Sequence, residues 1–274
     1  MGRFKRYRCR LLSYKIFTGD NLKKIVTICL SIFAVSACST NKKIVPKEAE
    51  KPAYIWYNEG VQEYIYHNYD DAEHSLDMVN EQHPGSIYAK RANLILGDVY
   101  FAKEEYILAR DYYSRFIKLY PLSSDAVYAQ YKIALSYYRS MNGYKLDSTP
   151  AQMAVKEFLK LIKKFPNSSY KEKAYNYMSE SALRIYEHEL FVAKFYDDLG
   201  HLKAADNRLE YMNEHFKNAD FSSEMLYLLA NVNYYLGKYQ YADKYFKELK
   251  RKFPESEYVQ KLNALLKNIK TKRK

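Results

Sequence analysis

Apolar residues recur at helical spacing through most of the chain, and the pattern is clearest between Arg91 and Pro121. That stretch holds two amphipathic helical segments separated by a short polar break at Lys103–Glu105. Gly97, Ala109 and Pro121 stand at intervals of 12 residues within it. Small residues allow two helices to approach closely, and proline cannot continue a helix. The pattern therefore predicts a pair of closely packed helices followed by a turn.

The same spacing recurs 37 residues earlier at Gly60, Ala72 and Pro84, and again further along the chain. A fixed period over paired helices is typical of a tetratricopeptide repeat (TPR) array. We predict an all-α TPR solenoid of about five helix-turn-helix repeats. The predicted divisions are N-terminal units one to three at 53–168, C-terminal units four and five at 169–256, and a capping helix with a basic tail at 257–274.

Three features depart from a uniform repeat. Unit three has an enlarged loop at 140–150, which either makes contacts or is a tolerated insertion. Residues 170–199 contain no helix-breaking signal and predict one long helix. Lys217 occupies the position where unit four would carry its proline.

The start of the chain has the pattern of a secreted protein. Lys23 and Lys24 precede a short apolar run, Ile25–Ala37, which is too short for a comfortable membrane span. The run ends in Val35-Ser36-Ala37-Cys38, which resembles the bacterial lipobox. This predicts a lipoprotein signal peptide at 1–37, a lipidated Cys38 and a flexible tether at 38–52. The alternative is an incidental cysteine beside an ordinary signal peptide.

Composition narrows the possible functions. The net charge is +12, but residues 1–37 carry +7 of it and leave a mildly basic body without a nucleic-acid motif. We therefore expect no nucleic-acid partner. No two of the six histidines stand four residues apart, and HExxH, GxGxxG, Walker-loop and GxSxG motifs are absent from the sequence. The sequence predicts no catalytic residues, metal or cofactor, and hence a protein that is not an enzyme.

The first helices of a TPR array line its concave face, and in units one to three those positions are rich in aromatic residues. A groove of this kind could hold an extended apolar peptide, with Arg91 receiving a carboxylate. The alternative is that many of these rings pack between helices. The same positions also give Val61, Asp98 and Leu135. The candidate groove residues are Tyr54, Tyr57, Tyr64, Arg91, Leu94, Phe101, Tyr128, Tyr131 and Tyr138.

The lipobox, tether, five TPR-like units and lengthened loop together resemble the BamD family of outer-membrane protein assembly factors. The strings WYNEG at 56–60, FPNSSY at 165–170 and YEHELFVA at 186–193 add to the resemblance. It implies a lipid-anchored protein on the periplasmic side of the outer membrane, within the β-barrel assembly machinery. The implied partners are BamA, other subunits of that machinery and unfolded outer-membrane β-barrel proteins.

The resemblance also assigns roles to two surfaces. It implies that the N-terminal groove reads an aromatic-ended targeting segment, and that Asn207 and Arg208 dock BamA. Lys217 and the long basic tail depart from the family pattern and weaken the assignment of the C-terminal contact. The alternative is a periplasmic TPR lipoprotein that serves as a scaffold in a pilus or cell-wall system.

Overall fold

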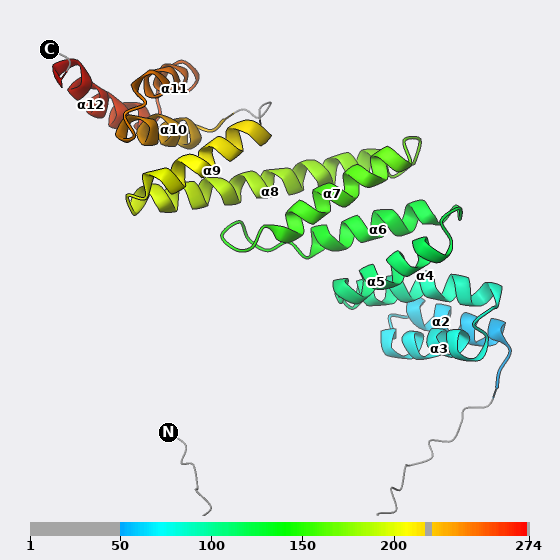
Figure 1. Ribbon diagram of the computed structural model, residues 1–274. Coiled ribbons are helices and arrows are strands. Elements are labelled where there is room, and N and C mark those ends of the chain that lie inside the picture. Colours follow the sequence, from blue (N-terminus) through cyan, green and yellow to red (C-terminus); the bar gives the residue numbers. More distant parts are fainter. Residues whose placement is uncertain (1–49, 217–220, 273–274) are drawn as a thin grey trace, which may run out of the picture. The chain divides into compact units, whose positions relative to one another are not determined.

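The computed structural model describes residues 50–216 and 221–272, and it is entirely helical where it forms regular structure (Figure 1). All of the helices belong to one compact unit, Lys51–Lys274. The signal peptide, Cys38, most of the tether and Lys217 lie outside the described residues. The helices are α2 (Ala53–Ile65), α3 (Tyr69–Gln82), α4 (Ile87–Ala102), α5 (Tyr106–Leu119), α6 (Ala126–Arg139), α7 (Thr149–Lys164), α8 (Lys171–Asp198), α9 (Leu202–His215), α10 (Ser223–Tyr235), α11 (Tyr239–Lys252) and α12 (Glu257–Lys272).

The helices form a TPR solenoid, as the period predicts. Each helix packs on the helices before and after it, and contacts also join α2 to α4, α6 to α8 and α8 to α10. The buried apolar residues fall into three clusters that follow one another along the chain, centred on α2–α5, on α6–α8 and on α9–α12. Burial is therefore spread as a ribbon of neighbouring contacts, which is the arrangement expected of stacked repeats.

Small residues mark the helix crossings. The second small residue of each unit is completely buried, and Gly97 shows why the first must be small. A Cβ atom at Gly97 would lie 2.6 Å from Cε1 of Tyr113, and one at Gly60 would lie 2.6 Å from Cγ of Leu76. The spacing therefore reflects close approach of the two helices within a unit. The five second small residues are Ala72, Ala109, Ala154, Ala205 and Ala242.

Four turns within units share one backbone device that the sequence pattern did not reveal. A residue with positive φ follows the first helix at His67, Glu104, Gly200 and Gly237. At Glu104 the backbone N–H donates to the Phe101 carbonyl, and the next N–H, of Glu105, donates to the Tyr100 carbonyl. This pair of bonds is the Schellman motif, in which glycine is the favoured residue. Two of the four turns therefore place a residue with a side chain in a conformation that suits glycine.

Unit three replaces this tight turn by the enlarged loop between α6 and α7. The loop is held at several points: the Asp147 carboxylate accepts from the Thr149 backbone and hydroxyl, and the His188 Nδ1 lies 2.8 Å from the Tyr144 carbonyl oxygen. His188 belongs to α8, so the loop is attached to the first helix of the next unit. α8 itself is a single helix of 28 residues, about 42 Å long.

Candidate functional site

Three candidate groove residues converge on a buried charged pair. Tyr64, Phe101 and Tyr128 come from α2, α4 and α6 and surround Asp98 and Lys132. The Lys132 Nζ lies 3.1 Å from Asp98 Oδ1, and the two side chains are only 13% and 12% exposed. The same Nζ stands 3.8 Å from the centroid of the Phe101 ring. The middle of the predicted groove is thus a polar centre enclosed by aromatic rings.

The Asp98 carboxylate is further held by two tyrosine hydroxyls. Tyr113 donates to Asp98 Oδ1 at 2.6 Å, and Tyr128 donates to the same oxygen. Burial, followed by the neighbouring Asp98 charge, raises the pKa of both hydroxyls well above the ordinary value, so both remain donors at neutral pH. Sequence reasoning did not single out Lys132; its spacing of four residues from Tyr128 on α6 was the available signal.

Tyr54, Tyr57 and Arg91 form the more open part of the candidate groove. Tyr54 and Arg91 are exposed, and Tyr57 is half-buried with its ring centroid 5.4 Å from that of Tyr88. Burial raises the pKa of the Tyr57 hydroxyl, while the nearby Arg91 guanidinium acts in the opposite direction. Leu94 is half-buried and packs against the N-terminal apolar cluster. In the part of the chain that the structure describes, Arg91 has no ion-pair partner, which leaves its guanidinium open to solvent.

The remaining two candidates pack against the start of α8. The ring of Tyr131 stacks 4.6 Å from that of Tyr170, and Tyr138 lies 4.6 Å from Tyr177. Tyr131 is only 8% exposed, and burial raises its pKa to about 12. The alternative interpretation, packing between helices, therefore describes Tyr131. Tyr138 is half-buried, and its hydroxyl donates to the Glu180 carboxylate.

The predicted docking pair, Asn207 and Arg208, lies exposed on α9. Arg208 Nη1 is 3.1 Å from Glu189 Oε2 of α8; the arginine side chain is 46% exposed and the glutamate side chain 5%. Arg208 therefore has a structural role, because Glu189 is a buried carboxylate that needs a cationic partner. Any substitution of Arg208 must be judged against that structural role.

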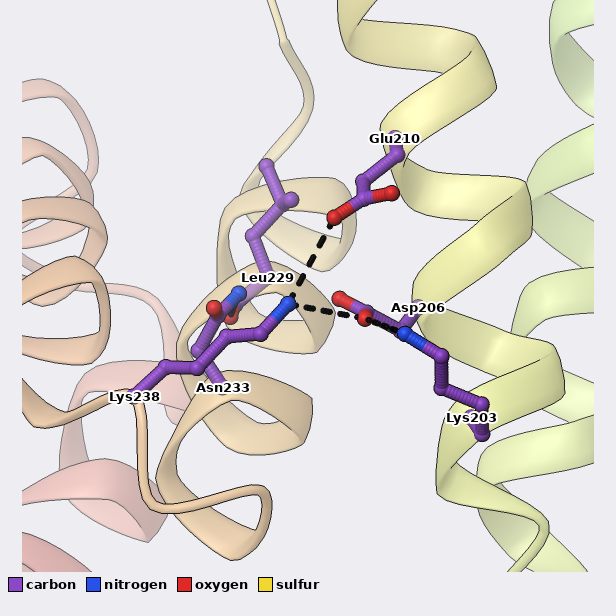
Figure 2. A network of polar contacts seen from close by, with 6 residues as sticks. All are labelled: Lys203, Asp206, Glu210, Leu229, Asn233 and Lys238. Atoms are coloured by element: carbon purple, nitrogen blue, oxygen red, sulfur yellow. Dashed lines mark hydrogen bonds and ion pairs between the residues drawn. The ribbon is translucent and has the colours of Figure 1, made fainter.

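A second buried carboxylate, Asp206, lies two residues before Arg208 on α9. Figure 2 shows Lys238, at the start of α11, reaching between Asp206 and Glu210 of α9. Its Nζ is 2.8 Å from Asp206 Oδ2, while Lys203 approaches the same oxygen at 3.4 Å. Hydrogen bonding to Asp206 is the main cause that raises the pKa of Lys238. Asp206, Glu210 and Lys238 line a cavity of about 330 Å³ between α9, α10 and α11, which sequence reasoning missed.

The described residues contain no group of three histidine, cysteine, aspartate or glutamate side chains placed to hold a metal ion. None of the described helices is both long and apolar enough to cross a membrane. The candidate sites described above are surfaces formed by side chains from neighbouring repeats. Fold and surfaces together define a TPR-type helical-repeat protein.

Comparison with known proteins identifies the family. The family model described as YfiO, outer membrane lipoprotein, matches residues 49–245, so the chain belongs to that family. A relative from Rickettsia prowazekii, named outer membrane protein assembly factor BamD, is 28% identical over 90% of this chain and 98% of its own length. The protein of the same name from Pasteurella multocida is 28% identical over 77% of this chain and 84% of its own.

A solved structure with similar helical repeats was also found. It is a tetratricopeptide repeat protein from Parabacteroides merdae, 16% identical, with a TM-score of 0.40. The match covers 88% of this chain and 95% of that protein.

Proposed function

We propose that this chain is a non-enzymatic outer-membrane lipoprotein of the β-barrel assembly machinery. In this role it binds BamA and unfolded outer-membrane proteins and helps their insertion into the outer membrane. The observation that carries the proposal is the family match across residues 49–245, together with relatives named outer membrane protein assembly factor BamD. The series of side-chain surfaces along the repeats suits a protein that acts by binding.

The lipid anchor at Cys38 is the part of the proposal that fixes location. With diacylglycerol on Cys38, the protein is held on the periplasmic side of the outer membrane without a spanning helix. Cys38→Ala should move the protein from the outer-membrane fraction to the soluble periplasmic fraction. Continued sedimentation of this variant with the outer membrane after a salt wash would contradict the anchor.

The open end of the N-terminal groove is proposed to receive the end of an unfolded barrel protein. Tyr54 and Tyr57 provide aromatic contact area, and the Arg91 guanidinium has no ion-pair partner among the described residues. Together they suit an aromatic residue next to a free carboxylate. We expect Tyr57→Ala with Arg91→Ala to weaken binding of a fluorescent peptide ending in phenylalanine by at least about tenfold. The matched control is Tyr175→Ala, which removes an exposed ring from α8.

The form of the peptide provides the counter-test. Amidating its terminal carboxylate should weaken binding to the unaltered chain but should change little for the double variant. Equal affinity of the free-acid and amidated peptides for the unaltered chain would remove Arg91 from the proposed site.

The contact with BamA is proposed to include Asn207 and Arg208. The first experiment is a mild-detergent pull-down of the full chain from its native membrane, with bound proteins identified by mass. Recovery of a large barrel protein with periplasmic repeats supports the assembly role. Recovery of pilus or cell-wall proteins alone would replace it with a scaffold function in one of those systems.

A further inference from the structure

The enlarged loop and α8 enclose a cavity of about 450 Å³ that the proposed function does not use. The loop contributes Tyr144 and Lys145 to the lining of this cavity, and α10 contributes Glu224. The floor is a continuous face of α8, because its residues follow one another at intervals of three or four. Those floor residues are Glu187, Leu190, Phe191, Lys194, Phe195 and Asp198.

Apart from Leu190, which also packs against the C-terminal apolar cluster, this face of α8 differs from the face that holds the repeats together. The buried positions of α8 recur at intervals of four, at Ser181, Ile185, Glu189 and Ala193. At 100° per residue, Phe191 points about 200° away from Glu189, which is nearly opposite. Glu189 is the partner of Arg208, so the cavity lies on the other side of α8 from the proposed BamA contact.

The cavity exposes apolar side chains whose exposure is not required for packing of the helical repeats. Phe195, in the last turn of α8, is 52% exposed, and Leu199, at the residue that caps the helix just beyond, is 55% exposed. The loop adds to this surface, because the Tyr144 ring meets the Phe191 ring edge-on with centroids 5.9 Å apart. A contiguous apolar surface bordered by charges is typical of a protein-binding site.

We propose that this cavity docks an amphipathic α-helix of a partner protein. The floor spans residues 187–198, about 17 Å, which matches three turns of a second helix. An extended segment would lay its backbone polar groups against Leu190, Phe191 and Phe195 without partners, because no strand edge is offered there. A helix brings its backbone hydrogen bonds with it and can place an apolar seam on the rings.

The charges around the cavity define the partner further. Glu187 pairs with Arg184 and Lys194 pairs with Glu224, so these four largely satisfy one another. Lys145 and Asp198 form no ion pair among the residues that the structure describes, although the Asp198 charge acts on Lys194 one turn earlier in the helix. Lys145 lies over the rings of Tyr144 and Phe191, whereas Asp198 stands about two turns beyond Phe191. The docked helix should therefore carry an acidic residue near Lys145 and a basic residue near Asp198.

Site-specific photo-crosslinking in cells that express the full chain tests this inference. A photoreactive benzoylphenylalanine replaces Phe195 in one variant, Tyr144 in a second and Tyr175 in a control. Tyr175 is an exposed ring of the same helix, about 200° around from Phe195. We expect adducts at the first two positions with one segment of one protein, at partner residues three or four apart, and none with that segment from Tyr175.

Charge reversal provides an independent measurement. With the photoreactive group at Tyr144, Asp198→Lys should lower the yield of that adduct about threefold, and reversing the partner's basic residue should restore it. Phe195→Glu should lower the yield at least about tenfold, while circular dichroism shows unchanged helicity. If Phe195→Glu does not fold, Lys145→Glu in the loop provides the same test without altering a helix.

Four results would overturn the proposal. The first is adduct formation at Phe195 and Tyr144 no higher than at Tyr175. The second is a set of partner residues that alternate every second position, because this would indicate an extended segment. The third is attachment to lipid alone. Capture of a protein without helical spacing of its attachment sites counts against the proposal as well.

Discussion

The N-terminal and C-terminal parts of the array each contain a buried carboxylate, and they stabilise its charge in different ways. In units two and three, Asp98 is held by two tyrosine hydroxyls and by Lys132, whose side chain is as buried as the carboxylate itself. In units four and five, Asp206 is held by Lys203 and Lys238, which reach in from the surface. Both carboxylates are buried, but the cation of the first centre is buried among aromatic rings and the cations of the second are partly exposed.

The difference indicates what each region can do. The Asp98 centre joins α4, α5 and α6 across two units, and shielding from water makes its interactions strong and insensitive to salt. The cations around Asp206 and Glu189 are partly exposed, so a partner protein can compete for them. We infer that the N-terminal centre mainly fixes the helices of the candidate groove, whereas the C-terminal ion pairs could rearrange if a partner docks there.

Removing the buried Lys132 cation should produce the largest loss of stability. Lys132→Met leaves Asp98 charged and buried with only its tyrosine donors, and we expect the free energy of unfolding to fall by about 3 kcal/mol. Lys238→Met should cost only about 1 kcal/mol, because Asp206 keeps Lys203 and the Lys238 side chain is partly exposed, so solvent already screens the pair. Urea-induced loss of helicity, followed by circular dichroism, measures both.

The double variant Asp98→Asn with Lys132→Met is the control for this comparison. It removes both charges while the tyrosine hydroxyls keep an acceptor, so it should recover much of the lost stability. Equal losses of unfolding free energy for Lys132→Met and Lys238→Met would show that the two centres do not differ in the way that the burial of their cations indicates.

Gly97→Ala should have the next largest effect. The added Cβ would lie 2.6 Å from the Tyr113 ring, and Tyr113 is itself fixed by its bond to Asp98, so the ring cannot move without disturbing that centre. We expect a loss of about 2 kcal/mol in unfolding free energy. Gly85→Ala, where an added Cβ meets nothing within 4 Å, is the matched control and should change stability little. A loss at Gly97 no larger than at Gly85 would contradict close helix approach.

The sequence predicted the features that depend on spacing and missed those that depend on how helices cross. Gly97, Ala109 and the helix pairs follow from the repeat period, and the long α8 follows from the absence of a break. Asp98, Lys132 and Tyr113 meet only after three helices have packed, so no local pattern brings them together. The periodicity likewise placed Tyr131 on the concave face but could not anticipate that Tyr170 of the next unit covers it.

Arg208 tests whether a C-terminal ion pair can be separated from partner docking. Arg208→Gln leaves Glu189 buried without its cation, and we expect a loss of about 1 kcal/mol because the arginine is nearly half exposed. Adding Glu189→Gln should restore most of that stability. If Arg208 also docks BamA, the stabilised double variant should still recover less BamA in a pull-down. If the double variant recovers as much BamA as the unaltered chain, the role of Arg208 is limited to its internal pairing with Glu189.

The smallest effect should come from the turns that both ends of the array share. Glu104 adopts φ 62° where the equivalent C-terminal turn has Gly237 at φ 77°. Glu104→Gly relieves the steric cost of a side chain in this conformation but adds freedom to the unfolded chain, so we expect a net gain of about 0.5 kcal/mol. Gly237→Ala should instead lower the free energy of unfolding. Because an added Cβ at Gly237 meets nothing within 4 Å, any loss there reports backbone conformation alone. A loss of stability in Glu104→Gly, measured by the same urea titration, would mean that the Glu104 side chain contributes more than its backbone strain costs.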